Sequence, residues 1–127
     1  MKIKIFVAIG AVLIVVIIAL CIFSVNIRTS DANIRYKYNG LELDVQITEE
    51  ESRILKKIFN GKIPLLGNPS CGFSEDISVY FEKQVFCIAR DKCPIIKYKG
   101  KYFSVSEKSR AVIEGIFEKY GGEFPCV

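Results

Sequence analysis

Four cysteines follow the apolar N-terminal segment and are the most reactive side chains of the chain: Cys71, Cys87, Cys93 and Cys126. A four-thiolate zinc site normally takes its ligands from two short Cys-x₂₋₄-Cys pairs, and a thioredoxin-like redox site needs Cys-x-x-Cys at a helix N-terminus. The intervals here are 16, 6 and 33 residues, which fit neither kind of site. An even number of cysteines in an exported domain instead predicts two disulfides.

The connectivity of these cysteines is open among three pairings. If residues 91–92 form the turn of a hairpin, Cys87 lies opposite Ile96, and this register disfavours a direct bond between Cys87 and Cys93. One favoured bond would attach a proline- and glycine-rich loop to the strands, and the other would attach the C-terminal tail to a strand. Each would contribute about 3–4 kcal/mol in the chain-entropy model. The pairs that we favour are Cys71–Cys93 and Cys87–Cys126.

The chain contains no histidine, and this absence excludes several common kinds of active site. Ser-His-Asp and Cys-His catalysis, His-ligated metal and the usual general base near neutral pH all require that residue. Neighbouring carboxylates do not replace it: Glu75 and Asp76 precede a strand, where adjacent side chains point to opposite faces. We therefore expect no catalytic, cofactor or metal site. The alternative is an envelope redox protein in which Cys87 or Cys93 is a reactive thiol.

A basic and aromatic hairpin is the strongest candidate for an interaction site. It interleaves three lysines with two tyrosines at a predicted tip, and such a tip could contact anionic lipid headgroups, cell-wall polymers or an acidic protein. The alternative interpretation is that the lysines protect an exposed hairpin from edge-to-edge association. The residues are Lys97, Tyr98, Lys99, Lys101 and Tyr102.

The N-terminal segment has the length and composition of a membrane-spanning helix. Residues 5–23 carry no charge and follow Lys2 and Lys4. At 1.5 Å per residue this run spans roughly 28 Å, close to the hydrocarbon thickness of a bilayer. Because the run is longer than a typical signal-peptide core and is followed by bulky residues, we predict an uncleaved anchor over residues 1–23. The positive-inside rule places the N-terminus in the cytoplasm and the remainder outside the cell, and a cleaved segment would make the protein secreted.

Charge in the exported part is nearly balanced, with 16 Lys or Arg and 14 Asp or Glu after residue 23. Nucleic-acid-binding proteins concentrate strong positive charge on one face. We therefore expect no nucleic-acid partner.

Turn and capping signals divide the exported part into a short tether, residues 24–32, and one domain, residues 33–127. Asn39-Gly40 is a strong hairpin signal, Thr48 and Glu51 form a capping box, and Ser106 caps a final helix. Short gaps between the last four strands require an antiparallel meander. The resulting order, β-β-α-β-β-β-β-α, predicts a two-layer α+β domain of antiparallel sheet and two amphipathic helices. The predicted strands are residues 33–38, 41–47, 76–81, 84–89, 94–98 and 101–105, and the helices are residues 49–60 and 107–120.

Residues 68–121 carry a Cys-Gly-Phe loop at positions 71–73 and an Ala-x-Asp-x-Cys turn at positions 89–93. In these motifs the segment resembles uncharacterised small exported proteins of clostridia-like bacteria. No activity comes with the resemblance. It implies a bond between the two motif cysteines, Cys71 and Cys93.

The expectation from the sequence is a single-pass membrane protein with an extracytoplasmic domain that binds another protein at the cell surface, as an inhibitor or immunity-type protein. A cell-envelope ligand or sensor domain is the third hypothesis, beside the redox protein. The small size, the anchor, the predicted disulfides and the absence of a catalytic constellation support the leading expectation.

Overall fold

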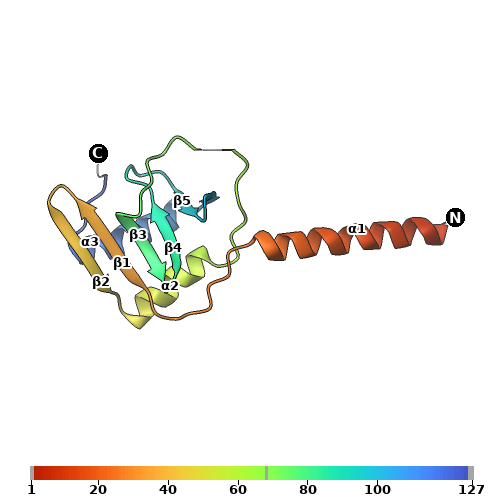
Figure 1. The fold of residues 1–127 in the computed structure, drawn as a ribbon, viewed down its shortest axis with the longest axis horizontal. Coiled ribbons are helices and arrows are strands. Elements are labelled where there is room, and N and C mark those ends of the chain that lie inside the picture. The colour runs from red at the N-terminus through yellow and green to blue at the C-terminus, as the bar shows by residue number, and fades with distance from the viewer. Residues whose placement is uncertain (1, 68, 126–127) are drawn as a thin grey trace.

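The computed structural model describes residues 2–67 and 69–125, without the side chains of residues 21–23. It confirms the predicted α+β class: an apolar N-terminal helix precedes a six-stranded antiparallel sheet and two further helices (Figure 1). The strand order is β2-β1-β3-β4-β5-β6. The elements are α1 Lys2–Phe23, β1 Asn33–Tyr38, β2 Leu41–Gln46, α2 Glu49–Phe59, β3 Ile77–Phe81, β4 Gln84–Ile88, β5 Ile95–Tyr98, β6 Lys101–Ser104 and α3 Glu107–Lys119.

The two short hairpins form where residues that tolerate positive φ occur. Asn39 and Gly40 have φ of 52° and 81°, and Lys99 and Gly100 have φ of 51° and 74°. Two consecutive positive φ values give the turn twist that matches antiparallel strands. These turns set the register of each hairpin, so that Tyr38 pairs with Leu41 and Tyr98 pairs with Lys101.

The helices begin at the predicted caps. Thr48 and Glu51 exchange hydrogen bonds in a capping box at the start of α2, and the Ser106 hydroxyl accepts a hydrogen bond from the Ser109 amide at the start of α3. Each cap satisfies amides that have no partner within the helix. Glu51 also accepts hydrogen bonds from Tyr120 at 2.6 Å and from Lys119 at 3.2 Å, so the capping box of α2 contacts the end of α3.

Glu51 couples the stability of the domain to acid pH. Its side chain is 12% exposed. Burial alone would raise its pKa, but the hydrogen bonds from Tyr120, Thr48 and Lys119 lower the pKa from 4.5 to about 2. A depressed carboxyl pKa stabilises the fold above pH 4.5, and this contribution is lost as pH falls towards 2.

We expect Glu51→Gln to lower the free energy of unfolding at pH 7 by about 1–2 kcal/mol, because a charge-assisted network loses its acceptor. The variant should also show a weaker pH dependence between pH 4.5 and 2 in urea unfolding of the full chain in micelles. Glu50→Gln, an exposed carboxyl in the same helical turn, is the control. Equal pH dependence in the wild type and Glu51→Gln would contradict this assignment.

Both helices of the domain contribute to one hydrophobic core against one face of the sheet. Ile34, Val79 and Phe86 are adjacent in register across β1, β3 and β4, and all are fully buried. Phe86 is stacked between two rings, Phe59 of α2 at 4.8 Å and Tyr98 of β5 at 4.4 Å. The other sheet face therefore carries the alternate residues of each strand.

Residues 24–32 are more than the predicted tether, because they add to the core. Val25 and Ile27 are 3% and 2% exposed. Val25 exchanges backbone hydrogen bonds with Gly61 and Lys62, and the amide of Ile27 donates to the side chain of Asn60. These bonds join the segment that follows α1 to the end of α2. The domain is consequently attached to α1 without a free linker.

The predicted register between the cysteine-bearing strands is wrong by one residue. Cys87 lies opposite Lys97, and Ile88 lies opposite Ile96. The connection between these strands is longer than a two-residue turn, because it runs from residue 89 to residue 94 and is held by side chains from elsewhere. Cys87 and Cys93 still lack a direct bond, as predicted.

Candidate functional site

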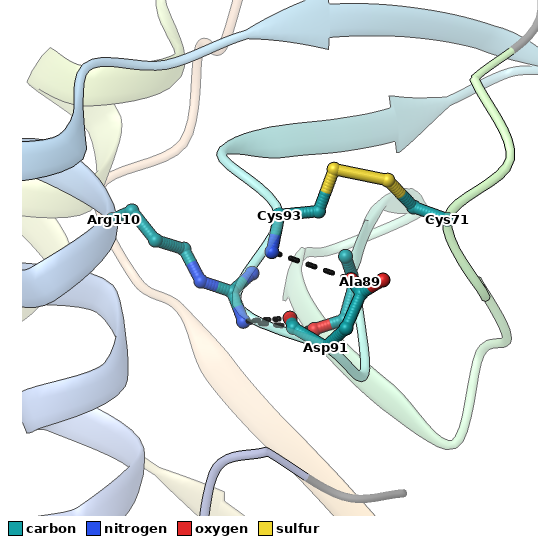
Figure 2. Close-up of a disulfide and its surroundings, with 5 residues drawn as sticks. All are labelled: Cys71, Ala89, Asp91, Cys93 and Arg110. Atoms are coloured by element: carbon teal, nitrogen blue, oxygen red, sulfur yellow. Dashed lines mark hydrogen bonds between the residues drawn. A yellow bond between two sulfur atoms is a disulfide. The ribbon is translucent and has the colours of Figure 1, made fainter.

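Cys71 and Cys93 form a disulfide with their Cα atoms 6.5 Å apart. The bond attaches the loop before β3 to the connection between β4 and β5 (Figure 2). The amide of Arg90 also donates to the carbonyl of Gly72 at 3.1 Å. The favoured pair Cys71–Cys93 is therefore present, and the loop lies over the sheet at this position.

A buried arginine holds the connection that carries Cys93. Arg110 of α3 is 4% exposed, and its Nη2 donates at 2.8 Å to the carbonyls of both Ala89 and Asp91 (Figure 2). Its Nε donates to Glu114 at 3.1 Å, and its guanidinium lies 4.9 Å from the centre of the Phe124 ring. Sequence reasoning missed Arg110, because an arginine in an amphipathic helix normally faces solvent.

The Asp91 carboxylate lies within 4.8 Å of the sulfurs of both bonded cysteines. Its oxygen accepts a hydrogen bond from the amide of Cys93 at 3.3 Å, a local contact that shapes the turn. Metal binding by cysteine requires thiolates, and these two sulfurs are bonded to each other. In the disulfide form this cluster is a structural turn.

Cys87 lies on β4 with its side chain on the sheet face away from the helices, and it is 9% exposed. It borders a hollow of about 330 Å³ together with Glu75 and Lys97. Burial and the Glu75 carboxylate raise the pKa of the Cys87 thiol, which Lys97 opposes. A raised pKa leaves little thiolate at neutral pH. The predicted partner of Cys87, Cys126, lies outside the described residues.

The side chains of the predicted interaction hairpin lie on two different faces of the sheet. Tyr98 faces the core and is 8% exposed, so it contributes little of the exposed surface of this hairpin. Lys97 and Tyr102 lie on the opposite face, with the ammonium 5.8 Å from the ring centre, and Tyr102 also contacts the Phe73 ring at 5.4 Å. The exposed tip is left with Lys99 and Lys101.

A second polar cluster lies on the same sheet face, over β1, β2 and β3. Arg35 and Asp44 form an ion pair at 3.6 Å, and their side chains are 44% and 51% exposed. The Arg35 guanidinium lies 5.4 Å from the ring centre of Tyr80, and the Tyr80 hydroxyl donates to Asp44. Burial and the Asp44 carboxylate raise the pKa of Tyr80, so the hydroxyl stays a donor. On the same face, Ser78 is in register with Arg35 and fully buried, so the exposed part of this cluster is formed by the side chains of Arg35 and Asp44.

Two further surfaces adjoin the end of α1. A hollow of about 560 Å³ is lined by residues 24–26 and 28–29, which include Arg28, and by the basic residues Lys83, Lys99 and Lys101. Beside it, the loop after α2 exposes apolar side chains at Ile63, Leu65 and Leu66. The signal for this surface in the sequence is a pair of adjacent leucines, Leu65 and Leu66, between Pro64 and Gly67.

No family model, curated protein or solved structure matches this chain.

Proposed function

We propose that this chain is a single-pass membrane protein whose extracytoplasmic α+β domain binds another protein, as an inhibitor or immunity-type protein does, and catalyses no reaction. The N-terminus lies in the cytoplasm. α1 supports the anchor, because residues 2–20 form a helix long and apolar enough to cross a membrane, with mean hydropathy 3.1. The disulfide supports an oxidising compartment outside the cytoplasm.

The observation that carries the binding proposal is the cluster of Arg35, Asp44 and Tyr80, in which the Arg35 and Asp44 side chains are about half exposed. Arginine and tyrosine are the residues most enriched at the energetic centres of protein interfaces. Their side chains are already held by one another, so binding orders few rotamers. A partner with complementary charge would contact this face and leave the fold unchanged.

The redox hypothesis receives little support from the thiols. Cys93 is bonded to Cys71, and Cys87 is buried with a raised pKa. Reactive cysteines instead have lowered pKa values in accessible, electropositive surroundings. The ligand or sensor hypothesis keeps one supporting observation, the basic hollow beside residues 24–29.

The binding face is tested by placing a photo-crosslinking amino acid at Lys37, an exposed residue on the same face of β1 as Arg35. We expect one discrete crosslinked partner from native membranes. Arg35→Glu in the same chain should weaken binding of that partner by about 2 kcal/mol, roughly 30-fold, because it reverses a central charge. The matched control is the same amino acid at Lys108, an exposed position on α3.

Crosslinking that is equal from Lys37 and Lys108, or that Arg35→Glu leaves unchanged, would rule out this face as the binding site. Because Arg35 is about half exposed, placing Glu opposite Asp44 is expected to cost less than about 1 kcal/mol of stability, and the domain stays folded.

A further inference from the structure

The loop between α2 and β3 exposes a cluster of apolar side chains that no packing explains. Ile63, Leu65 and Leu66 are 53%, 42% and 103% exposed, and they lie within four consecutive residues. An exposed apolar group of this kind marks a protein or membrane contact, or a ligand site. We define residues 63–66 as the apolar loop.

Backbone hydrogen bonds fix the apolar loop beside the end of α1. Val25, two residues after the helix ends, accepts from the Gly61 amide at 2.8 Å and donates to the Lys62 carbonyl at 3.0 Å. The Leu65 amide donates to the carbonyl of Tyr102 at 2.7 Å, which attaches the loop to β6. The loop therefore cannot move away from α1 without breaking these bonds.

The apolar loop and α1 border the same groove, of about 460 Å³. The side chains of Ala19 and Leu20 line it together with residues 63–67 and 100–102. In Figure 1 the green loop after α2 runs along the side of the domain from which α1 projects. The loop thus reaches the level of residues that belong to the apolar run of α1.

The position of the apolar loop along the axis of α1 indicates that membrane lipid covers its side chains. Leu20 lies three residues before the end of α1 at Phe23, which corresponds to about 4–5 Å along the helix axis. Segments that lie in a membrane interface bury their apolar side chains about 5–10 Å into the headgroup and acyl boundary. If α1 spans the bilayer, the apolar loop has the same depth as such a segment.

Charge around the loop also suits a lipid surface. Lys99 and Lys101 are exposed at the tip of the β5–β6 hairpin, and Lys101 and Tyr102 line the groove beside the loop. Lysines at this level can contact lipid phosphates, and tyrosine is enriched at the membrane–water interface. The cluster combines an apolar centre with a basic rim.

We infer that the apolar loop inserts into the outer leaflet of the membrane that α1 spans, so that the domain rests on the bilayer in a fixed orientation. This inference rests on the anchor of the proposed function. Lys99 and Lys101 contact anionic headgroups, and the sheet face with Arg35 and Tyr80 remains in water.

Tryptophan fluorescence tests the inference, because the chain has no tryptophan of its own. Leu66→Trp introduces a single fluorophore at a fully exposed position, so the fold is not perturbed. The full chain is reconstituted in phosphatidylcholine–phosphatidylglycerol vesicles that contain lipids brominated in the upper acyl chain, a short-range quencher. We expect a blue-shifted emission and strong quenching.

Two further single-tryptophan variants make the outcome decisive. Leu41→Trp lies in the β1–β2 hairpin, 38% exposed and at the end of the domain away from α1, and should show water-like emission without quenching (Figure 1). Leu13→Trp lies in α1 and reports on the anchor. Its quencher is a lipid brominated deep in the acyl chain.

Quenching of Leu66→Trp and Leu13→Trp, but not of Leu41→Trp, would support the inference. If Leu13→Trp is quenched while Leu66→Trp stays water-like, the anchor holds and membrane docking of the loop is refuted. If Leu13→Trp is not quenched, the anchor itself fails, and the docking fails with it. Vesicles without phosphatidylglycerol should weaken the quenching of Leu66→Trp, and unchanged quenching would refute the role of the lysines.

Discussion

Replacement of Arg110 by methionine is expected to destabilise the domain by about 3–4 kcal/mol. Arg110 is 4% exposed and is the donor to two backbone carbonyls and to the carboxylate of Glu114. Methionine fills similar space but donates no hydrogen bond. In the variant, the carbonyls of Ala89 and Asp91 therefore lose their hydrogen bonds from the arginine. The carboxylate of Glu114, which is 14% exposed, loses its cationic partner.

Urea unfolding of the full chain in detergent micelles, followed by tyrosine fluorescence, measures this loss. Lys108→Met is the matched control, since it makes the same kind of replacement at an exposed position of α3 and should change stability by less than about 0.5 kcal/mol. Similar stabilities for the two variants would show that the contacts of Arg110 do not hold the connection between β4 and β5.

The second large effect is expected from the disulfide. Replacing both Cys71 and Cys93 by serine should lower the free energy of unfolding by about 3 kcal/mol, because a bond across a separation of 22 residues restricts the unfolded chain by that amount. The free loop before β3 would also lose its fixed position over the sheet.

Reduction of the wild type provides an independent check on the serine variant. The reduced wild type should unfold at the same urea concentration as the double variant, and reductant should leave the double variant unchanged. A wild type whose stability does not respond to reductant would contradict a stabilising bond between Cys71 and Cys93.

The elements of the fold could be predicted from the sequence because their signals are local. Asn39-Gly40 and Lys99-Gly100 supply the positive φ values of two hairpins, and Thr48 and Ser106 cap the two helices of the domain. Each signal acts within a few residues and does not depend on the rest of the chain. The structure places the strands and helices within one or two residues of the predicted bounds.

Features that depend on distant contacts could not be predicted in the same way. The pairing of β1 with β3 brings together strands separated by α2, and no local pattern specifies it. The register of β4 with β5 depends on a connection that Arg110 holds from α3. Composition alone predicts that Tyr98 belongs to an exposed tip, whereas its position two residues after the buried Ile96 places its side chain on the core face.

For the candidate surfaces too, the residue types could be predicted from the sequence, but their arrangement in space could not. The four cysteines and the basic hairpin were visible as residue types, but the sheet determines which of these side chains reach solvent. The cluster of Arg35, Asp44 and Tyr80 joins three strands and has no signature in any one of them. The apolar loop can be recognised as a membrane contact only because hydrogen bonds to the segment after α1 place it beside the end of that helix.

Membrane docking requires that α1 is retained as an anchor, and the Cys71–Cys93 disulfide requires that the domain folds in an oxidising compartment. The most direct test is mass spectrometry of the chain extracted from native membranes, with thiols alkylated and no reductant added. We predict a chain that retains residues 1–23 and in which Cys71 and Cys93 are linked and unmodified. A chain that begins after residue 23, or alkylation of both cysteines, would contradict an anchored extracytoplasmic domain.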